Sequence, residues 1–60
     1  MTPPGVTIGR TWTPKRGHRD AGQLTIRMIH RADRAVTVRT SEGDRRTIAW
    51  RELRRVWKPS

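Results

Sequence analysis

The chain has 60 residues, no cysteine, and 14 Lys and Arg against five Asp and Glu, which gives a formal net charge of +9. This length holds one domain at most, and the lack of cysteine excludes disulfide or thiolate–metal reinforcement of a small core. No signal peptide and no transmembrane segment is recognisable, so an intracellular, cytoplasmic location is expected. A GC-rich genome would explain why arginine outnumbers lysine, but not why cations outnumber anions. The surplus predicts a polyanionic partner.

A first strand is predicted around Val6, Ile8 and Trp12, because their even spacing places them on one face of an extended chain. Pro14 then restricts the end of this strand to a sheet edge or a loop. Residues 15–22 have the sequence KRGHRDAG, which is typical of an exposed loop. Because four of these residues are cations or histidine, two interpretations remain open: a loop that grips phosphate and a solvated connector.

A second strand is predicted at about residues 23–30, followed by a turn at 31–34 and a third strand at 35–40. Met28 and Ile29 are both apolar, which breaks the alternation of the second strand. Either a β-bulge re-aims the side chains that follow, or Ile29 packs on the opposite face against a loop or a partner.

The carboxy-terminal part begins with a polar turn at residues 41–44 and a fourth strand at about 45–50. The last segment of the chain allows two interpretations. Residues 47–57 have apolar residues at helical spacing, which allows one helix. Alternatively, residues 51–53 form a single 3-10 turn and 54–58 form a short fifth strand. The β-branched residues that open this segment favour the second interpretation.

Twelve apolar residues form the predicted core. They are Val6, Ile8, Trp12, Leu24, Ile26, Met28, Val36, Val38, Ile48, Trp50, Leu53 and Val56. Among the tryptophans, Trp12 and Trp50 are predicted to point inward. Trp57 lies in a basic stretch, and it is interpreted either as a residue that closes the fold or as a stacking platform for a base.

This succession of short strands, tight turns and a 3-10 element resembles the small β-barrels of the Src-homology type, which include the KOW, Tudor and retroviral integrase C-terminal domains. The resemblance lies in the pattern of residues 22–27, 35–39, 41–44 and 47–57, and it covers about residues 12–57. It implies an all-β fold, a small five-stranded barrel with a one-turn 3-10 element near the C-terminus. Barrels of this type often bind nucleic acid, and many bind peptides.

The corresponding domain division places a flexible tail or edge strand at residues 1–8, a single small barrel domain at 9–58 and a second tail at 59–60. No internal repeat divides the chain further. We expect a monomer or a weak dimer.

Arginine alternates with apolar residues along the predicted strands, so the outward face of the sheet is expected to be cationic, with Arg27, Arg39, Arg51 and Arg55 upon it. The planar guanidinium fork suits phosphate oxygens. The predicted nucleic-acid contacts are Lys15, Arg16, Arg19, Arg27, Arg39, Arg45, Arg46, Arg51, Arg54, Arg55 and Trp57.

Catalysis and metal binding are not expected. His18 and His30 are the only imidazoles, and with no cysteine nearby they do not make a zinc site. The chain has no glycine-rich phosphate loop and no grouping of nucleophile, base and acid. We therefore predict no enzymatic activity, no metal and no cofactor.

Three functions remain open. The first is a small basic protein that binds nucleic acid, double-stranded DNA in preference to RNA, through phosphates and with weak sequence preference; it would be nucleoid-associated. The second is an interaction module that docks on an acidic protein, such as a polymerase or a phage-assembly component, with Ile29 or Trp57 as its anchor. The third is a helix-turn-helix-like DNA binder with residues 47–57 as the recognition helix.

Overall fold

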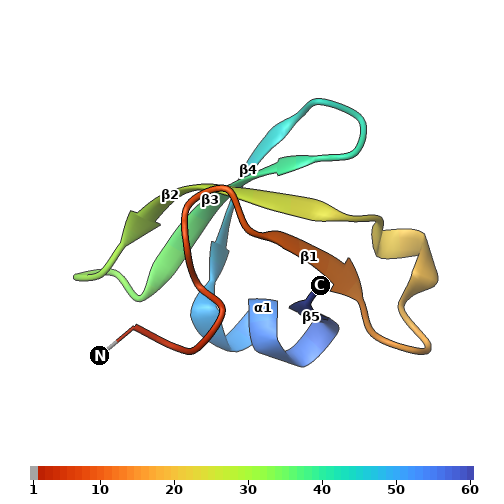
Figure 1. The fold of residues 1–60 in the computed structure, drawn as a ribbon, viewed down its shortest axis with the longest axis horizontal. Helices are drawn as coiled ribbons and strands as arrows, with labels where there is room; N and C mark the ends of the chain where they lie inside the picture. Colours follow the sequence, from red (N-terminus) through yellow and green to blue (C-terminus); the bar gives the residue numbers. More distant parts are fainter. Residues whose placement is uncertain (1) are drawn as a thin grey trace.

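The computed structural model describes residues 2–60 as five antiparallel strands with one short α-helix and one 3-10 turn (Figure 1). The elements in chain order are β1 (Thr11–Pro14), η1 (Arg19–Ala21), β2 (Leu24–His30), β3 (Ala35–Thr40), β4 (Arg45–Ala49), α1 (Trp50–Val56) and β5 (Trp57–Pro59). The strands form one sheet in the order β4-β3-β2-β1-β5. The predicted mostly-β fold with five strands is confirmed.

The two edges of the sheet are β4 and β5. Within residues 2–60 they do not pair with each other, so the sheet is open at this point. The helix α1 links the two edge strands and contacts both of them. Figure 1 shows α1 lying against one side of the curved sheet, while the β3–β4 hairpin projects away from it. The molecule therefore has a helix-covered inner side and an uncovered outer side.

A β-bulge interrupts the pairing of β2 with β3. The register shifts between Ile26 and Met28, after which Met28 pairs with Thr37 and Ile29 pairs with Val36. The extra residue returns Ile29 to the inner face, where it packs against the core, and leaves Met28 54% exposed. The bulge interpretation of the sequence is confirmed, and the prediction of Met28 as a core residue is wrong.

The first strand starts later than the spacing of its apolar residues predicts. Residues 8–9 form a turn in which Gly9 N donates to Ile26 O, and regular pairing begins at Thr11. Ile8 is therefore 64% exposed, and its predicted place in the core is wrong. Val6 is buried, because Trp12 Nε1 donates to Gly5 O across 3.0 Å and holds the amino-terminal segment against the core.

The segment after β4 is helical, which corrects two predictions. A seven-residue α-helix replaces the single 3-10 turn at 51–53, and the fifth strand begins only at Trp57 rather than at 54. A helix over 47–57 is also wrong, because the β-branched start of that segment stays in β4. The good helix formers that come after Ala49 form α1 and bury an apolar face.

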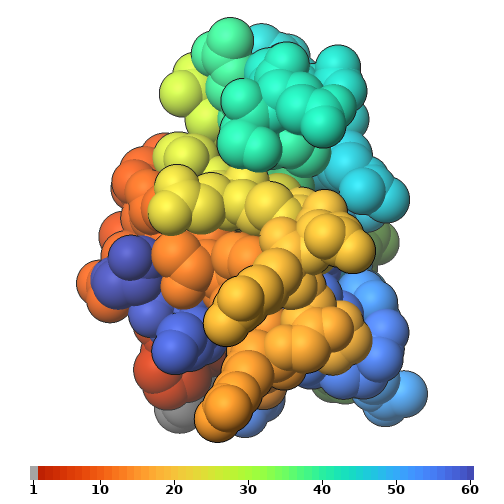
Figure 2. Space-filling model, turned by 90° about the vertical axis from the view of Figure 1, so that its right-hand side faces the viewer, coloured from red at the N-terminus to blue at the C-terminus, as the bar shows by residue number. Residues whose placement is uncertain are grey.

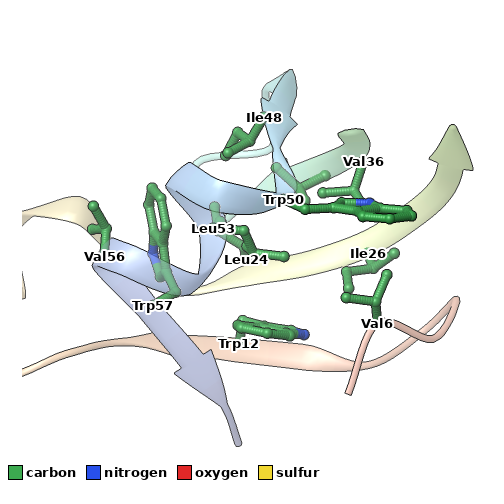
Figure 3. Packing of buried hydrophobic residues seen from close by; sticks show 11 residues of the cluster. Val6, Trp12, Leu24, Ile26, Val36, Ile48, Trp50, Leu53, Val56 and Trp57 are labelled. Carbon is green, nitrogen blue, oxygen red and sulfur yellow. The ribbon is translucent and has the colours of Figure 1, made fainter. Parts of the chain in front are cut away.

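The core lies between the inner face of the sheet and α1 (Figure 3). Apart from Ile8 and Met28, the whole predicted core is buried, and Ala35 and Trp57 join it. Trp12 and Trp50 are buried as predicted. Trp57 is 6% exposed, and its Nε1 donates to Gly22 O at 2.8 Å, so it closes the fold between β5 and the loop before β2. No helix in the described part of the chain is long and apolar enough to cross a membrane.

Candidate nucleic-acid interface

The helix α1 has one apolar face and one cationic face. Its buried residues are Trp50, Leu53 and Val56. Between them, Arg51, Arg54 and Arg55 are exposed, and their i, i+3 and i+4 spacing places them side by side on the opposite face. Burial of the apolar face in the core therefore directs these three arginine side chains to the solvent on one side of the helix.

The turn between β2 and β3, residues 31–34, is attached to the start of this helix. Trp50 N donates to Arg34 O at 2.8 Å, and Trp50 Nε1 donates to Ala35 O at 3.1 Å inside the core. These bonds bring the turn, with Arg31 and Arg34, next to α1 although 16 or more residues separate them in sequence.

The loop that follows β1 is attached to the other end of α1. Lys15 N donates to Val56 O at 2.7 Å, and the Lys15 ammonium donates to Arg54 O. A cation beside the last carbonyl groups of a helix is favourable, because these carbonyls carry the negative end of the helix dipole. Lys15 is therefore held beside the arginines of α1.

Together these segments form an open, shallow groove of about 1200 Å³. We call it the basic groove. Its cationic lining residues are Lys15, Arg31, Arg34, Arg51, Arg54 and Arg55. Asp33 is the one acidic residue in the lining, and Pro3, Ala32, Ala49 and Trp50 complete it. Six cations against one anion give the groove a strongly positive potential.

Acidic side chains neutralise little of this charge. The single salt bridge within residues 2–60 joins Arg55 and Glu52, with Arg55 Nη2 at 2.6 Å and Nε at 3.1 Å from the two carboxylate oxygens. The hydrogen bonds from Arg55, more than its charge, hold the pKa of Glu52 below its ordinary value of 4.5. The same pair raises the pKa of Arg55. Among residues 2–60, the other five cations of the groove have no carboxylate partner.

Arg34 has an unusual backbone. Its φ is +50°, and it is the only non-glycine residue with positive φ in the described chain. This left-handed conformation costs an L-residue with a Cβ about 1–2 kcal/mol, which is why turns usually place glycine or asparagine there. The chain keeps an arginine at a position where glycine would be less strained, and its side chain lines the groove.

The structure brings together four of the predicted contacts, Lys15, Arg51, Arg54 and Arg55, in the basic groove. They do not lie on the outer face of the sheet, where the sequence placed two of them: Arg51 and Arg55 belong to the helix, not to a strand. The predicted position of Arg51 and Arg55 on the sheet is therefore wrong, because the alternation along a strand does not continue into α1.

The remaining predicted cations are dispersed. Arg39 and Arg45 are paired across β3 and β4 at the far end of the sheet, and Arg46 points to the opposite face from Arg45. Arg27 lies in the bulge of β2 and is exposed. The exposed residues Arg16 and Arg19 belong to the loop between β1 and β2, outside the basic groove.

Trp57 is not available as a stacking platform. Only 6% of the residue is exposed, and its ring N–H already donates to a backbone carbonyl, so the ring offers no open face on which a base could stack. Arg31 and Arg34 line the groove but were not among the predicted contacts. The observed register of β3 with β4 places Trp50 opposite Arg34, and this pairing brings the turn against the helix.

The imidazole groups do not form a metal site in the described chain, where no three His, Cys, Asp or Glu residues converge. His30 Nε2 and Thr37 Oγ1 share a hydrogen bond of 2.7 Å on the outer face of the sheet. Comparisons of the chain with protein-family models, with curated proteins and with solved structures each return no match.

Proposed function

We propose that this protein binds nucleic acid, double-stranded DNA in the first place, through phosphate contacts in the basic groove and with weak sequence preference. One observation carries the proposal: six cationic side chains from three separate chain segments converge on one groove, and of these only Arg55 has a carboxylate partner in the part of the chain that the structure describes. Backbone phosphates supply the missing anions, and the release of their counterions supplies affinity.

The aromatic residues support a duplex over unstacked single strands. Proteins that bind single strands stack successive bases on exposed aromatic rings. This chain has three tryptophans and no Phe or Tyr. Trp12, Trp50 and Trp57 are all buried, with at most 9% of each residue exposed. A groove that offers guanidinium groups, and whose one aromatic residue, Trp50, is buried, suits a stacked duplex with its phosphates outward.

Docking on an acidic protein is the weaker alternative. The residues expected to anchor such a partner were Ile29 and Trp57, but Ile29 is packed against the core and Trp57 is buried. Interface affinity depends on apolar anchors more than on rim charges, and the one large apolar residue that lines the groove, Trp50, is buried. A helix-turn-helix mode is not proposed, because α1 has seven residues and the only other helical element among residues 2–60 is the three-residue η1.

We also propose that the fold is related to the Src-homology-type barrels. The five-strand antiparallel order and the short helical element before β5 support it. The unpaired edges of β4 and β5 are the feature that a fully closed barrel would not have.

The test is the salt dependence of duplex affinity, measured by fluorescence anisotropy with a labelled DNA duplex. If about six phosphates are contacted, log K falls with a slope of about −5 against log salt. The variant Arg51→Gln/Arg54→Gln removes two contacts and is expected to bind at least about tenfold more weakly at low salt, with a slope shallower by about 2.

The matched control is Arg10→Gln/Lys58→Gln, which removes the same charge from exposed positions outside the groove. It is expected to lose only the small affinity that results from lower net charge. Equal losses in the two variants would reject the groove as the site. A slope near zero, or no binding at low salt, would reject nucleic acid as the partner and turn attention to an acidic protein.

A further inference from the structure

A second cationic feature lies on the outer face of the sheet. The register places Arg39 directly opposite Arg45, Thr25 opposite Arg39, and Thr11 opposite Thr25. These residues form one line across β4, β3, β2 and β1, which we call the outer row: Arg45, Arg39, Thr25 and Thr11. Side chains in such a line stand about 5 Å apart on one face of the sheet.

The two arginines of the outer row occupy the more closely spaced of the two types of cross-strand pair. The backbone bonds Trp50 N to Arg34 O and Thr40 N to Asp44 O mark the hydrogen-bonded positions of the β3–β4 ladder. The positions of Arg39 and Arg45 fall between these, in a non-hydrogen-bonded pair, where the Cα atoms are only about 4.5 Å apart. The Thr37 and Thr47 hydroxyls occupy the same type of pair and lie 3.4 Å apart.

Like charges in this position are destabilising, and the nearby acids do not compensate them. Glu42 and Asp44 lie in the adjoining turn, but neither forms a salt bridge with Arg39 or Arg45 in the described chain. Arg39 Nη2 instead lies over the turn, 4.0 Å from where a Cβ on Gly43 would stand. Arg39 and Arg45 occupy opposite positions on neighbouring strands, with Thr25 opposite Arg39 on the other side, and their side chains carry the donor groups that a phosphate binds.

The groove arginines of α1 and the outer row lie on different sides of the sheet. The helix packs on the inner face of the sheet, whereas the outer row lies on the opposite face, which the groove reaches only at Ala49, the last residue of β4. They are also at opposite ends of β3: five residues separate Arg34 from Arg39, which is about 17 Å of extended chain. Figure 1 and Figure 2 show the β3–β4 hairpin projecting from the body on the side away from α1.

We propose that the outer row binds the phosphates of a second duplex, so that one protein molecule bridges two DNA segments. The inference rests on the proposed function of the groove. To reach both sites, a single duplex would have to bend around the protein, which measures only 29 × 21 × 16 Å. DNA resists such a sharp bend, because it stays nearly straight over about 50 nm. Two phosphate-binding sites on opposite faces therefore engage two segments.

The test uses two short duplexes, one with a donor fluorophore and one with an acceptor, mixed with the 60-residue protein at low salt. Bridging brings the two labels together and gives energy transfer. Wild-type protein is expected to give a clear signal. The variant Arg39→Gln/Arg45→Gln is expected to lose the signal by about tenfold or more, while its affinity for a single duplex stays within about threefold of the Arg10→Gln/Lys58→Gln control.

The outcomes separate the two proposals. If the wild type binds a single duplex but does not bridge, the outer row is rejected and the groove stands. If it binds no duplex, both fail. If Arg39→Gln/Arg45→Gln bridges as well as the wild type, bridging arises elsewhere, for example from protein dimers, and the inference is overturned. The substitution also removes like-charge repulsion, so a higher melting temperature at low salt shows that this variant is folded.

Discussion

The two turns at the ends of β3 each contain a residue with left-handed backbone conformation, but they differ in the residue and in the bonds that support it. The β3–β4 turn places glycine, Gly43, at its left-handed position with φ of +91°, and bonds from Asp44 N to Thr40 Oγ1 and from Gly43 N to Thr40 O complete it locally. The β2–β3 turn has Arg34 at its left-handed position. It has one bond of its own, from Arg34 N to Arg31 O at 3.2 Å, and a second bond from a distant element, since Trp50 N donates to Arg34 O.

The difference shows where the chain accepts strain. A turn that is closed by its own bonds and has glycine at positive φ needs no support from the core. The turn with arginine at this position has, besides its own bond, the two bonds from Trp50 at the start of α1, which help to hold the strained conformation. The strained turn is the one that delivers two cations to the basic groove. Strain and charge thus coincide at the site where we propose phosphate binding.

The largest effect is expected from removing the support of the strained turn. Trp50→Ala deletes a buried indole and its bond to Ala35 O, which we expect to cost about 3–5 kcal/mol of unfolding free energy. In a chain of this size such a loss leaves little folded protein. Urea denaturation followed by tryptophan fluorescence and circular dichroism measures it. Trp50→Phe, which keeps most of the volume, should lose less, and wild-type stability in Trp50→Ala would contradict the supporting role.

A smaller effect is expected at the relaxed turn. Gly43→Ala places a Cβ on a residue with φ of +91°, which costs about 1–2 kcal/mol. No atom stands closer than 4.0 Å to the new Cβ, so the loss comes from the backbone and not from a clash. Thermal unfolding provides the measurement, with Ser41→Ala in the same turn as the control. An unchanged melting temperature would show that the hairpin relaxes without cost.

At the β2–β3 turn, we expect a change in stability of the opposite sign. Arg34→Gly relieves the left-handed strain, while the flexible glycine costs about 0.5–1 kcal/mol in the unfolded chain. Stability should therefore stay unchanged or rise by up to about 1 kcal/mol. Duplex affinity should fall about three- to tenfold, with one phosphate contact fewer in the salt slope.

Arg34→Asn is the control for this comparison, because asparagine tolerates positive φ but carries no charge. It should lose affinity as Arg34→Gly does. If both variants bind as tightly as the wild type, the strained arginine does not contact the ligand.

The smallest effect is expected at Arg55, the groove cation that forms a salt bridge with Glu52. Because hydrogen bonds from Arg55 lower the pKa of Glu52, the stabilisation they give is complete above the ordinary value of 4.5 and is lost as pH falls through the lowered value. Both groups are exposed, so the change in stability is slight. Glu52→Gln should abolish this pH dependence and, by freeing Arg55, raise duplex affinity about twofold at low salt. Lower affinity in this variant would contradict a groove that binds anions.

Much of the fold can be predicted from local patterns. The alternation along β3 gives its bounds as observed, and the adjacent Met28 and Ile29 indicate the bulge in β2. The sequence failed where tertiary contacts decide. Ile8 has the spacing of a strand residue, but the turn at Gly9 leaves it outside. The last segment has both β-branched and helix-forming residues, and the boundary between strand and helix falls between Ala49 and Trp50, inside one pattern.

Less of the candidate site could be predicted from the sequence. The charge of the chain predicts an anionic partner, and Arg51, Arg54 and Arg55 attract attention because they are near one another in sequence. Arg31 and Arg34 belong to the same groove only because Trp50 binds the turn, a contact between distant segments. Periodicity along a single strand or helix cannot reveal such a contact, whereas the strand register can.

The most direct measurement is a titration of isotope-labelled protein with a short DNA duplex, followed through the backbone amide and arginine Nε signals in NMR spectra at low and high salt. The account predicts salt-sensitive shifts at Arg31, Arg34, Arg51 and Arg54, with Arg10 little changed. Shifts confined to the exposed apolar residues Ile8 and Met28, or no shifts at low salt, would contradict a basic groove that binds nucleic-acid phosphates.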